Sequence, residues 1–262
     1  MICGVTGIGR ARLHARPEDE SSPESCARVM ALTQRRASGE PLAYVLGNAI
    51  FRSRAFITRP GVLIPRPETE ILTEIASCRM ERLTGGEGRF ADWCTGSGCI
   101  AVTLALENPS WLCWAADSSA EAIEIARENA AAHGVQDRIN FVKCDRPSDA
   151  LGSIPPRSLD FVVSNPPYIP RGEISSLEEQ VVRWEPREAL DGGSDGLDVY
   201  RTLLSELTPL MKPRAELLFE TGGTDQADQV GRLAGRWFEF AGKFDDHRGI
   251  SRFLLLKTPD MI

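Results

Sequence analysis

From residue 89 onward, short uninterrupted apolar stretches alternate with longer stretches whose apolar residues recur at every third or fourth position. The short stretches are typical of strands buried on both faces of a sheet, and the longer ones are typical of the helices that connect such strands. The expected strands are Arg89–Cys94, Leu112–Asp117, Arg138–Asp145, Leu159–Asn165, Ala215–Thr221, Glu239–Phe244 and Arg252–Lys257. Helices are expected at Ile100–Glu107 and Ala120–Ala132. This alternation predicts an α/β fold with a seven-stranded, doubly wound sheet.

The N-terminal part of the chain has a different pattern. Residues 24–37 place apolar side chains on one helical face and are followed by a Ser-Gly stop signal, which predicts one amphipathic helix. Residues 49–58 predict a hairpin of two short strands. The first 25 residues have no apolar signal core and little helical periodicity, so we expect no secretion signal and a disordered start. The chain is therefore divided into an N-terminal helix and hairpin, residues 1–59, and a larger domain, residues 60–262.

Between these two parts, residues 60–70 predict a rigid connector that leads into a helix, because prolines occupy the first turn and acidic residues follow them. The helix is expected to run to about Leu83, before a Gly-Gly pair. Two interpretations of the connector stay open. It is either a linker with a helix cap, or a segment whose Arg66, Glu68 and Glu70 line the mouth of a pocket.

Composition excludes several classes of function. Hydrophobic residues make up 42% of the chain and charged residues 26%, as in ordinary soluble proteins. No apolar run approaches the roughly 20 residues of a membrane helix, so no membrane association is expected. The net charge of -7 argues against binding nucleic acid through a general basic surface. The seven cysteines include no Cys-x-x-Cys pair and predict reduced thiols in the cytoplasm, and the three histidines lie apart from every motif.

Candidate nucleoside-binding residues follow the first three expected strands. The first strand runs into a glycine turn made of Cys94, Thr95, Gly96, Ser97 and Gly98. Glycines permit a tight turn here, and the helix after it offers free N–H groups. Asp117 ends the second strand, where a carboxylate can accept both hydroxyls of a ribose, and Asp145 and Arg146 close the third, near an adenine edge. Each acid alone is equally typical of a helix cap, but together with the glycine turn they predict a nucleoside pocket.

The fourth expected strand runs into Asn165, Pro166, Pro167 and Tyr168. These residues end the strand, because two successive prolines remove two backbone donors. The side-chain carbonyl of Asn165 and the main-chain carbonyl of Pro166 can accept the two N–H bonds of a planar nitrogen, while the Tyr168 ring packs on its flat face. A proline-rich loop with an Asx turn is the alternative. Beside a nucleoside pocket, the motif predicts S-adenosyl-L-methionine as the cofactor and methyl transfer to nitrogen.

Further motifs stand in order along the chain: Arg35–Tyr44, Pro65–Glu70, Thr95–Gly98, Ser164–Pro170, Glu185-Pro186 with Ala189-Leu190, Asp195–Asp198, and Glu220 with Gln226. In this ordered set the chain resembles the HemK/PrmC family of protein-glutamine methyltransferases, which methylate the glutamine of the Gly-Gly-Gln motif in peptide chain release factors. The resemblance implies a Rossmann-like, S-adenosylmethionine-dependent methyltransferase fold with a small N-terminal helical and hairpin appendage. It implies cofactor contacts from residues 94–98, Asp117, Asp145 and Arg146, and Asn165, and a glutamine amide held by residues 165–168.

The chain departs from the family pattern at two places, and each departure leads to an expectation about binding. The family's glycine turn usually begins with glycine where this chain has Cys94, so a positive φ at this position would impair cofactor binding. The family also carries an N-terminal helical bundle that helps to dock the release factor, whereas about 47 residues precede the hairpin here, with one clear helix. The second departure affects substrate affinity more than chemistry.

Three other functions stay open. A sister family methylates a glutamine of a ribosomal protein, and a nucleic-acid methyltransferase uses a similar clamp on the amino group of a flipped adenine or cytosine. The acidic balance and the lack of a sizeable target-recognition segment argue against the second of these. A nucleotide-binding scaffold without activity is the third, and it predicts no methyl transfer to any substrate. The sequence favours no particular oligomeric state.

Overall fold

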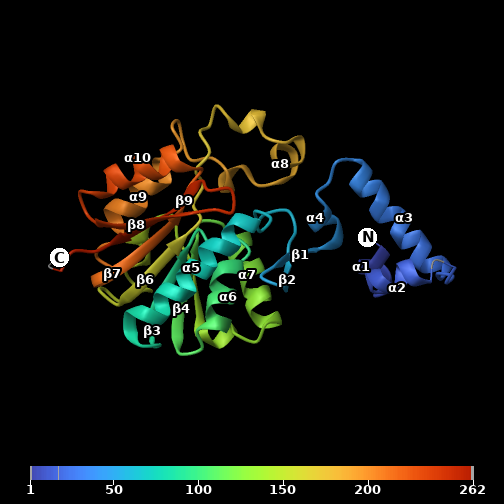
Figure 1. The fold of residues 1–262 in the computed structure, drawn as a ribbon, viewed down its shortest axis with the longest axis horizontal. Helices are drawn as coiled ribbons and strands as arrows, with labels where there is room; N and C mark the ends of the chain where they lie inside the picture. Colours follow the sequence, from blue (N-terminus) through green and yellow to red (C-terminus); the bar gives the residue numbers. More distant parts are fainter. Residues whose placement is uncertain (1, 17, 261–262) are drawn as a thin grey trace.

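The computed structural model describes residues 2–16 and 18–260. Within these residues, seven strands form one sheet in the order β5-β4-β3-β6-β7-β9-β8 (Figure 1). In chain order they are β3 (Gly88–Trp93), β4 (Trp111–Asp117), β5 (Ile139–Lys143), β6 (Leu159–Ser164), β7 (Met211–Glu220), β8 (Glu239–Asp245) and β9 (Ser251–Lys257). Strands β3 to β7 pair in parallel, and β9 pairs antiparallel with both β7 and β8. The predicted seven-stranded α/β fold is confirmed.

The strand order reverses at β3. From β3 the chain moves outward through β4 to β5, and it then returns to the other side of β3 as β6. At such a reversal the connections after neighbouring strands diverge, which leaves a crevice at the carboxyl ends of the strands. The ends of β3, β4 and β6 carry most of the predicted site residues.

Helices cover both faces of the sheet. One face packs against α5 (Pro67–Thr84), α6 (Cys99–Glu107) and α7 (Ala120–Ala132), and the other packs against α9 (Asp198–Glu206) and α10 (Thr224–Ala234) (Figure 1). Leu72 and Met80 of α5 are fully buried on the first face, and Tyr200 and Leu204 of α9 on the second. Burial of each such apolar side chain contributes roughly 1.5–3 kcal/mol. These two apolar layers hold the strand ends in fixed positions.

Short elements occupy the connections. They are α8 (Glu179–Trp184) and the 3-10 helices η1 (Gln136–Arg138), η2 (Pro147–Ala150), η3 (Ile174–Ser176) and η4 (Arg187–Ala189). None of the described helices combines the length and the apolar character that crossing a bilayer requires.

Strand β7 differs from its predicted boundaries. It begins at Met211 instead of Ala215, and its pairing with β6 shifts in register between Leu159 and Phe161. The added residues include Pro213, which has no N–H to donate to the ladder. The irregular start explains why the sequence pattern showed only the regular part of the strand.

The N-terminal region is more helical than predicted. Its described part contains α1 (Ile2–Thr6), α2 (Arg10–Ala15), α3 (Pro23–Ala37) and α4 (Leu42–Leu46), followed by the hairpin strands β1 (Asn48–Phe51) and β2 (Arg54–Ile57). The helix over residues 24–37 and the hairpin are confirmed, but the disordered start and the single helix are wrong. Helices as short as α1 and α2 show no helical period in the sequence, and α1 packs against α3.

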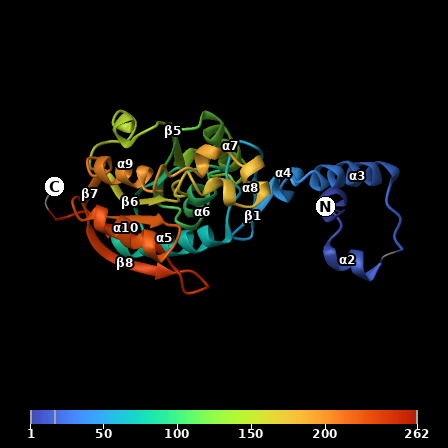
Figure 2. The same cartoon turned by 90° about the horizontal axis from the view of Figure 1, so that it is seen from above.

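Helices α1 to α3 extend away from the sheet, and α4 lies between them and the rest of the chain (Figures 1 and 2). Arg35, near the end of α3, pairs with Glu40 through Nε at 2.8 Å and donates to the main-chain oxygen of Tyr44 at 3.3 Å. The Tyr44 hydroxyl is buried and donates to the main-chain oxygen of Val62 at 2.6 Å. These contacts join the N-terminal helices to the connector before α5.

Candidate functional site

A buried carboxylate fixes the glycine turn after β3. Asp92 is fully buried, and its Oδ2 accepts hydrogen bonds from the Thr95 hydroxyl at 2.6 Å and the Ala101 N–H at 3.1 Å. Burial raises the pKa of Asp92 to about 7, and the two hydrogen bonds oppose this rise. Asp92 therefore ties the turn to the first turn of α6.

The turn has left-handed backbone, with φ of 62° at Cys94, 54° at Gly96 and 77° at Gly98. A Cβ at Gly98 would lie 2.9 Å from the Cβ of Ala126, so glycine is needed where α6 approaches α7. A Cβ at Gly96 would meet open space, because Gly96 lines a cavity. Cys94 has the positive φ that its side chain disfavours, at a cost of roughly 1–2 kcal/mol.

Asp117, at the end of β4, faces this turn. Its Oδ2 accepts from the Gly96 N–H at 2.8 Å, and its Oδ1 accepts from the Ser119 N–H at 2.9 Å. Burial raises the pKa of Asp117, while the bonds from Ser119 and Gly96 oppose the rise. Each carboxylate oxygen has two lone pairs, so both retain the capacity to accept a ribose hydroxyl.

Two adjoining cavities of about 420 and 380 Å³ open beside Asp117, a size typical of small-molecule sites. Both are lined by Cys94, Asp117, Ser118, Pro167 and Glu188. The larger cavity also contains Gly96, and the smaller one contains Asp145 and Arg146. Thr95 and Ser97 of the turn are buried. Of the predicted cofactor residues, those that line these cavities are Cys94, Gly96, Asp117, Asp145, Arg146 and Asn165, whereas Thr95, Ser97 and Gly98 line neither cavity.

Asp145 and Arg146 are engaged with neighbouring charges. The Lys143 ammonium donates to Asp145 Oδ1 at 2.9 Å, and Arg146 pairs with Glu206 of α9. Both side chains are largely exposed. These residues therefore border the outer end of the smaller cavity.

Asn165 lies between two cavities. It lines the 420 Å³ cavity, and it also lines a third cavity of about 380 Å³ together with Pro166, Tyr168, Leu63 and Arg66. Pro167 lines the two cavities on the side of the glycine turn. The segment from Asn165 to Tyr168 is thus a wall with a different cavity on each side. We call the third cavity the substrate-side cavity and the other two the turn-side cavities.

The side chain of Asn165 is held from one end. Its Nδ2 donates to the Thr69 hydroxyl at 3.1 Å, and that hydroxyl donates to Glu220 Oε2 at 2.8 Å. Among the residues that the structure describes, none donates a hydrogen bond to Asn165 Oδ1. The oxygen predicted to accept a substrate N–H is therefore free of protein partners.

Tyr168 is positioned through its main chain. Its carbonyl oxygen accepts from Gln226 Nε2 at 2.9 Å, and Gln226 Oε1 accepts from the Gly222 N–H at 2.7 Å. Burial raises the pKa of Tyr168, so its hydroxyl is neutral at physiological pH. The ring therefore offers an apolar face and an uncharged hydroxyl.

A buried glutamate shapes the substrate-side cavity. Glu185 accepts from the Ile64 N–H at 3.0 Å and from Arg66 at 2.6 Å, and only 1% of its side chain is exposed. Arg66 lines the cavity, as the second interpretation of the connector predicts, whereas Glu70 accepts from the Arg52 N–H of the hairpin. The connector is thus both a linker and a cavity wall.

The supporting roles of Thr69, Glu185, Glu220 and Gln226 were missed from the sequence. All four lie in the ordered motifs, but they reach the site from α5, the segment after α8, the end of β7 and α10. No local pattern indicates that Thr69 and Gln226 will contact Asn165 and Tyr168. Nor does one indicate that Glu220 will bind Thr69, or that Glu185 will bind Arg66.

The sequence of this chain matches known families and individual relatives. The family described as Methyltransferase small domain matches residues 68–193, and the PrmC N-terminal domain matches residues 1–47. A protein of Nitratidesulfovibrio vulgaris named release factor glutamine methyltransferase is 38% identical over 260 residues, 98% of this chain and 86% of the relative. A protein of the same name from Neisseria gonorrhoeae is 40% identical over 258 residues, 97% of this chain and 89% of the relative.

Solved structures share the fold at low sequence identity. The hMettl16 catalytic domain in complex with the MAT2A 3′UTR hairpin 6 has a TM-score of 0.59 and 16% identity, covering 92% of this chain and 83% of that one. A ribosomal protein L11 methylase from Lactobacillus delbrueckii subsp. bulgaricus has a TM-score of 0.54 and 19% identity, covering 77% and 83%. At these identities the likeness concerns the fold alone.

Proposed function

Because this chain belongs to the family of release factor glutamine methyltransferases, we propose that it methylates a glutamine side-chain amide, using S-adenosyl-L-methionine, in the Gly-Gly-Gln motif of peptide chain release factors. The placement of Asn165 between the turn-side and substrate-side cavities is the observation that carries this proposal. An amide that enters from the substrate-side cavity meets a free oxygen at this wall, and the methyl donor is held behind it.

The wall acts on the amide by orientation. An amide nitrogen is a weak nucleophile because its lone pair is delocalised. Asn165 Oδ1 and the main-chain carbonyl of Pro166 accept its two N–H bonds, and the Tyr168 ring packs on the flat face of the amide. Such orientation is worth roughly 7–11 kcal/mol in favourable cases. The nitrogen becomes acidic once it is alkylated and loses a proton to solvent, so the chain needs no strong base.

The turn-side cavities suit the methyl donor. S-adenosyl-L-methionine supplies an electrophilic methyl group when it is bound. The open space at Gly96 admits it against the backbone, Asp117 accepts the ribose hydroxyls, and Asp145 and Arg146 border the adenine end. The remaining residues of the turn, Thr95, Ser97 and Gly98, with Cys94, hold the shape of this cradle.

The two parts of the chain have different proposed roles. Residues 1–59 contribute to docking the release factor, and residues 60–262 bind the cofactor and perform the transfer. The match of residues 1–47 to the PrmC N-terminal domain supports this division. The protein acts in the cytoplasm on a protein partner, without direct contact to nucleic acid.

Incubation of the chain with labelled S-adenosyl-L-methionine and a purified release factor, followed by mass mapping, tests the proposed function. We expect one methyl group on the side chain of the Gly-Gly-Gln glutamine, and no label on a factor in which this glutamine is replaced by alanine. A matched incubation with ribosomal proteins and with RNA identifies the other candidates. Label on one of these, with none on the release factor, would overturn the proposed substrate.

A further inference from the structure

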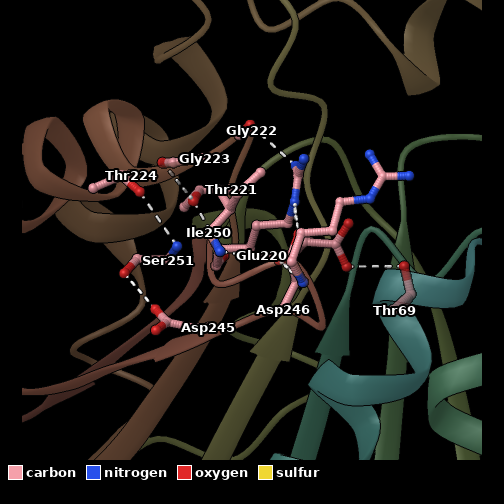
Figure 3. Close-up of polar contacts among 12 residues, drawn as sticks. Thr69, Glu220, Thr221, Gly222, Gly223, Thr224, Asp245, Asp246, Ile250 and Ser251 are labelled. Carbon is pink, nitrogen blue, oxygen red and sulfur yellow. Dashed lines mark hydrogen bonds and ion pairs between the residues drawn. The ribbon is translucent and has the colours of Figure 1, made fainter.

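Three side chains from distant parts of the chain form one hydrogen-bonded line that ends at Asn165 of the wall. Asn165 follows β6, Thr69 lies in the first turns of α5, and Glu220 ends β7. The Asn165 amide donates to the Thr69 hydroxyl at 3.1 Å, and the hydroxyl donates to Glu220 at 2.8 Å. Figure 3 shows the Glu220 carboxylate extending from β7 toward Thr69. Only 3% of Thr69 and 1% of Glu220 is exposed, so water does not substitute for these contacts.

The direction of this line follows from counting protons. A hydroxyl can donate one hydrogen bond, and the Thr69 hydroxyl donates it to Glu220. A carboxylate only accepts hydrogen bonds, so it cannot return one to Thr69. The Thr69 oxygen is then left with lone pairs alone, and it requires a donor from Asn165. The amide of Asn165 must therefore turn its NH₂ group toward Thr69 and its oxygen away from it.

The orientation of Asn165 decides what the wall offers to a substrate. A glutamine amide nitrogen carries two N–H donors, and it needs an acceptor. If the Asn165 amide were flipped by half a turn, its NH₂ group would face those donors and neither side would be satisfied. We propose that Thr69 and Glu220 are positioning residues that keep Asn165 Oδ1 directed at the substrate amide, an inference that rests on the proposed function.

The charges around Glu220 are consistent with this role. Burial raises the pKa of Glu220 to about 7, and the negative charge of Glu68 adds to this rise. The hydrogen bond from Thr69 and the positive charges of Arg252 and Arg66 oppose it. Burial raises the pKa of the Tyr168 hydroxyl, and the charge of Glu220 adds to this rise. At pH 8.5 Glu220 is a carboxylate, and the proton count above applies.

The main-chain end of β7 is fixed independently of this line. The buried Tyr200 hydroxyl donates to the main-chain oxygen of Glu220 at 2.6 Å. Tyr200 therefore holds the backbone of Glu220, and the Glu220 side chain orients the Thr69 hydroxyl. Removal of the Thr69 hydroxyl should leave the fold in place.

Threonine 69 offers a clean test with a matched control on the same helix. Thr69→Val keeps the shape and removes the hydroxyl, whereas Thr69→Ser keeps the hydroxyl. Thr73→Val removes an equally buried hydroxyl that donates to the main-chain oxygen of Thr69. At pH 8.5 we expect Thr69→Val to lower kcat with a release factor by about tenfold or more, with the S-adenosylhomocysteine affinity within about twofold. Thr69→Ser should recover most of the rate, and Thr73→Val should stay near the wild type.

A second measurement does not depend on turnover. The side-chain NH₂ signals of Asn165, identified in nitrogen-15 NMR spectra by their loss in Asn165→Asp, should shift and exchange faster with water in Thr69→Val, but not in Thr73→Val. Unchanged signals in Thr69→Val, or a kcat within about twofold of the wild type, would overturn the positioning role. If the wild-type chain methylates no release factor, the proposed function fails, and these spectra still decide whether Thr69 orients Asn165.

Discussion

The turn-side and substrate-side cavities meet at Asn165, but they are built in different ways. On the turn side, Asp117 binds main-chain N–H groups of the turns that follow β3 and β4, and Asp92 binds the Ala101 N–H in the first turn of α6. On the substrate side, Asn165 and Tyr168 are held by side chains from α5 and α10. The proposed cofactor cradle is thus held by carboxylates that bind nearby main-chain groups, whereas the wall depends on side chains that reach it from distant elements.

This contrast predicts that the two sides can be damaged separately. A substitution that removes a side chain of the wall should slow transfer while the cradle still binds cofactor. A substitution of a cradle carboxylate should weaken the cofactor first, because the main-chain N–H groups it holds lose their acceptor. Equal loss of binding and turnover after every substitution would mean that the two sides form one unit.

The largest difference between loss of turnover and loss of cofactor binding is expected from Asn165→Ala. Loss of the acceptor oxygen should lower kcat by about 10²–10³ or more, the scale seen when one preorganised hydrogen-bonding group is removed from an active site. Calorimetry should show cofactor affinity within a few fold of the wild type. Asn140→Ala, which removes an exposed asparagine of β5, is the control. A mutant with an unimpaired single-turnover rate would remove Asn165 from the reaction.

Asp117→Ala is the converse experiment. Hydrogen bonds to a charged group are worth about 1.5–3 kcal/mol, so the Kd for S-adenosyl-L-methionine should rise by about 10- to 150-fold. At saturating cofactor, kcat should recover toward the wild-type value. Asp137→Ala, at an exposed aspartate of η1, should leave the Kd unchanged. Calorimetry that gives the same Kd for Asp117→Ala and the wild type would refute the assignment.

The pH dependence of the free energy of unfolding distinguishes the contribution of Glu220 from those of the other buried acids. Burial raises the pKa of Glu220 from an ordinary 4.5 to about 7, so the folded chain holds a proton that the unfolded chain releases. The resulting stabilisation is complete below pH 4.5 and is lost as the pH rises through about 7. Glu220→Gln should flatten this decline in the free energy of unfolding by about 1–3 kcal/mol in urea unfolding. Asp92 and Asp117, whose pKa values burial also raises, should contribute to the part that remains. Parallel curves for wild type and variant would contradict the shift.

The smallest effect is expected at Cys94. Both Cys94→Gly and Cys94→Ala remove the thiol, but only glycine tolerates the φ of 62° without strain. The glycine variant should unfold with a free energy about 1 kcal/mol higher than the alanine variant, and it should bind cofactor at least as tightly. Equal stability of the two variants would mean that the turn relaxes around the side chain.

The parts of the fold that the sequence predicted are those with a local signal. Buried strands appear as apolar runs, and the glycine turn and Asn-Pro-Pro-Tyr follow strand ends directly, so their shared edge could be inferred. Helices α1 and α2 were missed because they are too short to show a period. The roles of Thr69 and Glu220 were missed because their contact joins residues from α5 and β7, which only the tertiary structure brings together.

A structure of the chain with S-adenosylhomocysteine and a Gly-Gly-Gln peptide would examine the wall most directly. The account predicts the glutamine amide nitrogen in the substrate-side cavity, within about 2.7–3.2 Å of both Asn165 Oδ1 and the Pro166 carbonyl, with Asn165 Nδ2 still on Thr69. A glutamine bound elsewhere, or an Asn165 amide turned with its NH₂ group toward the peptide, would contradict it.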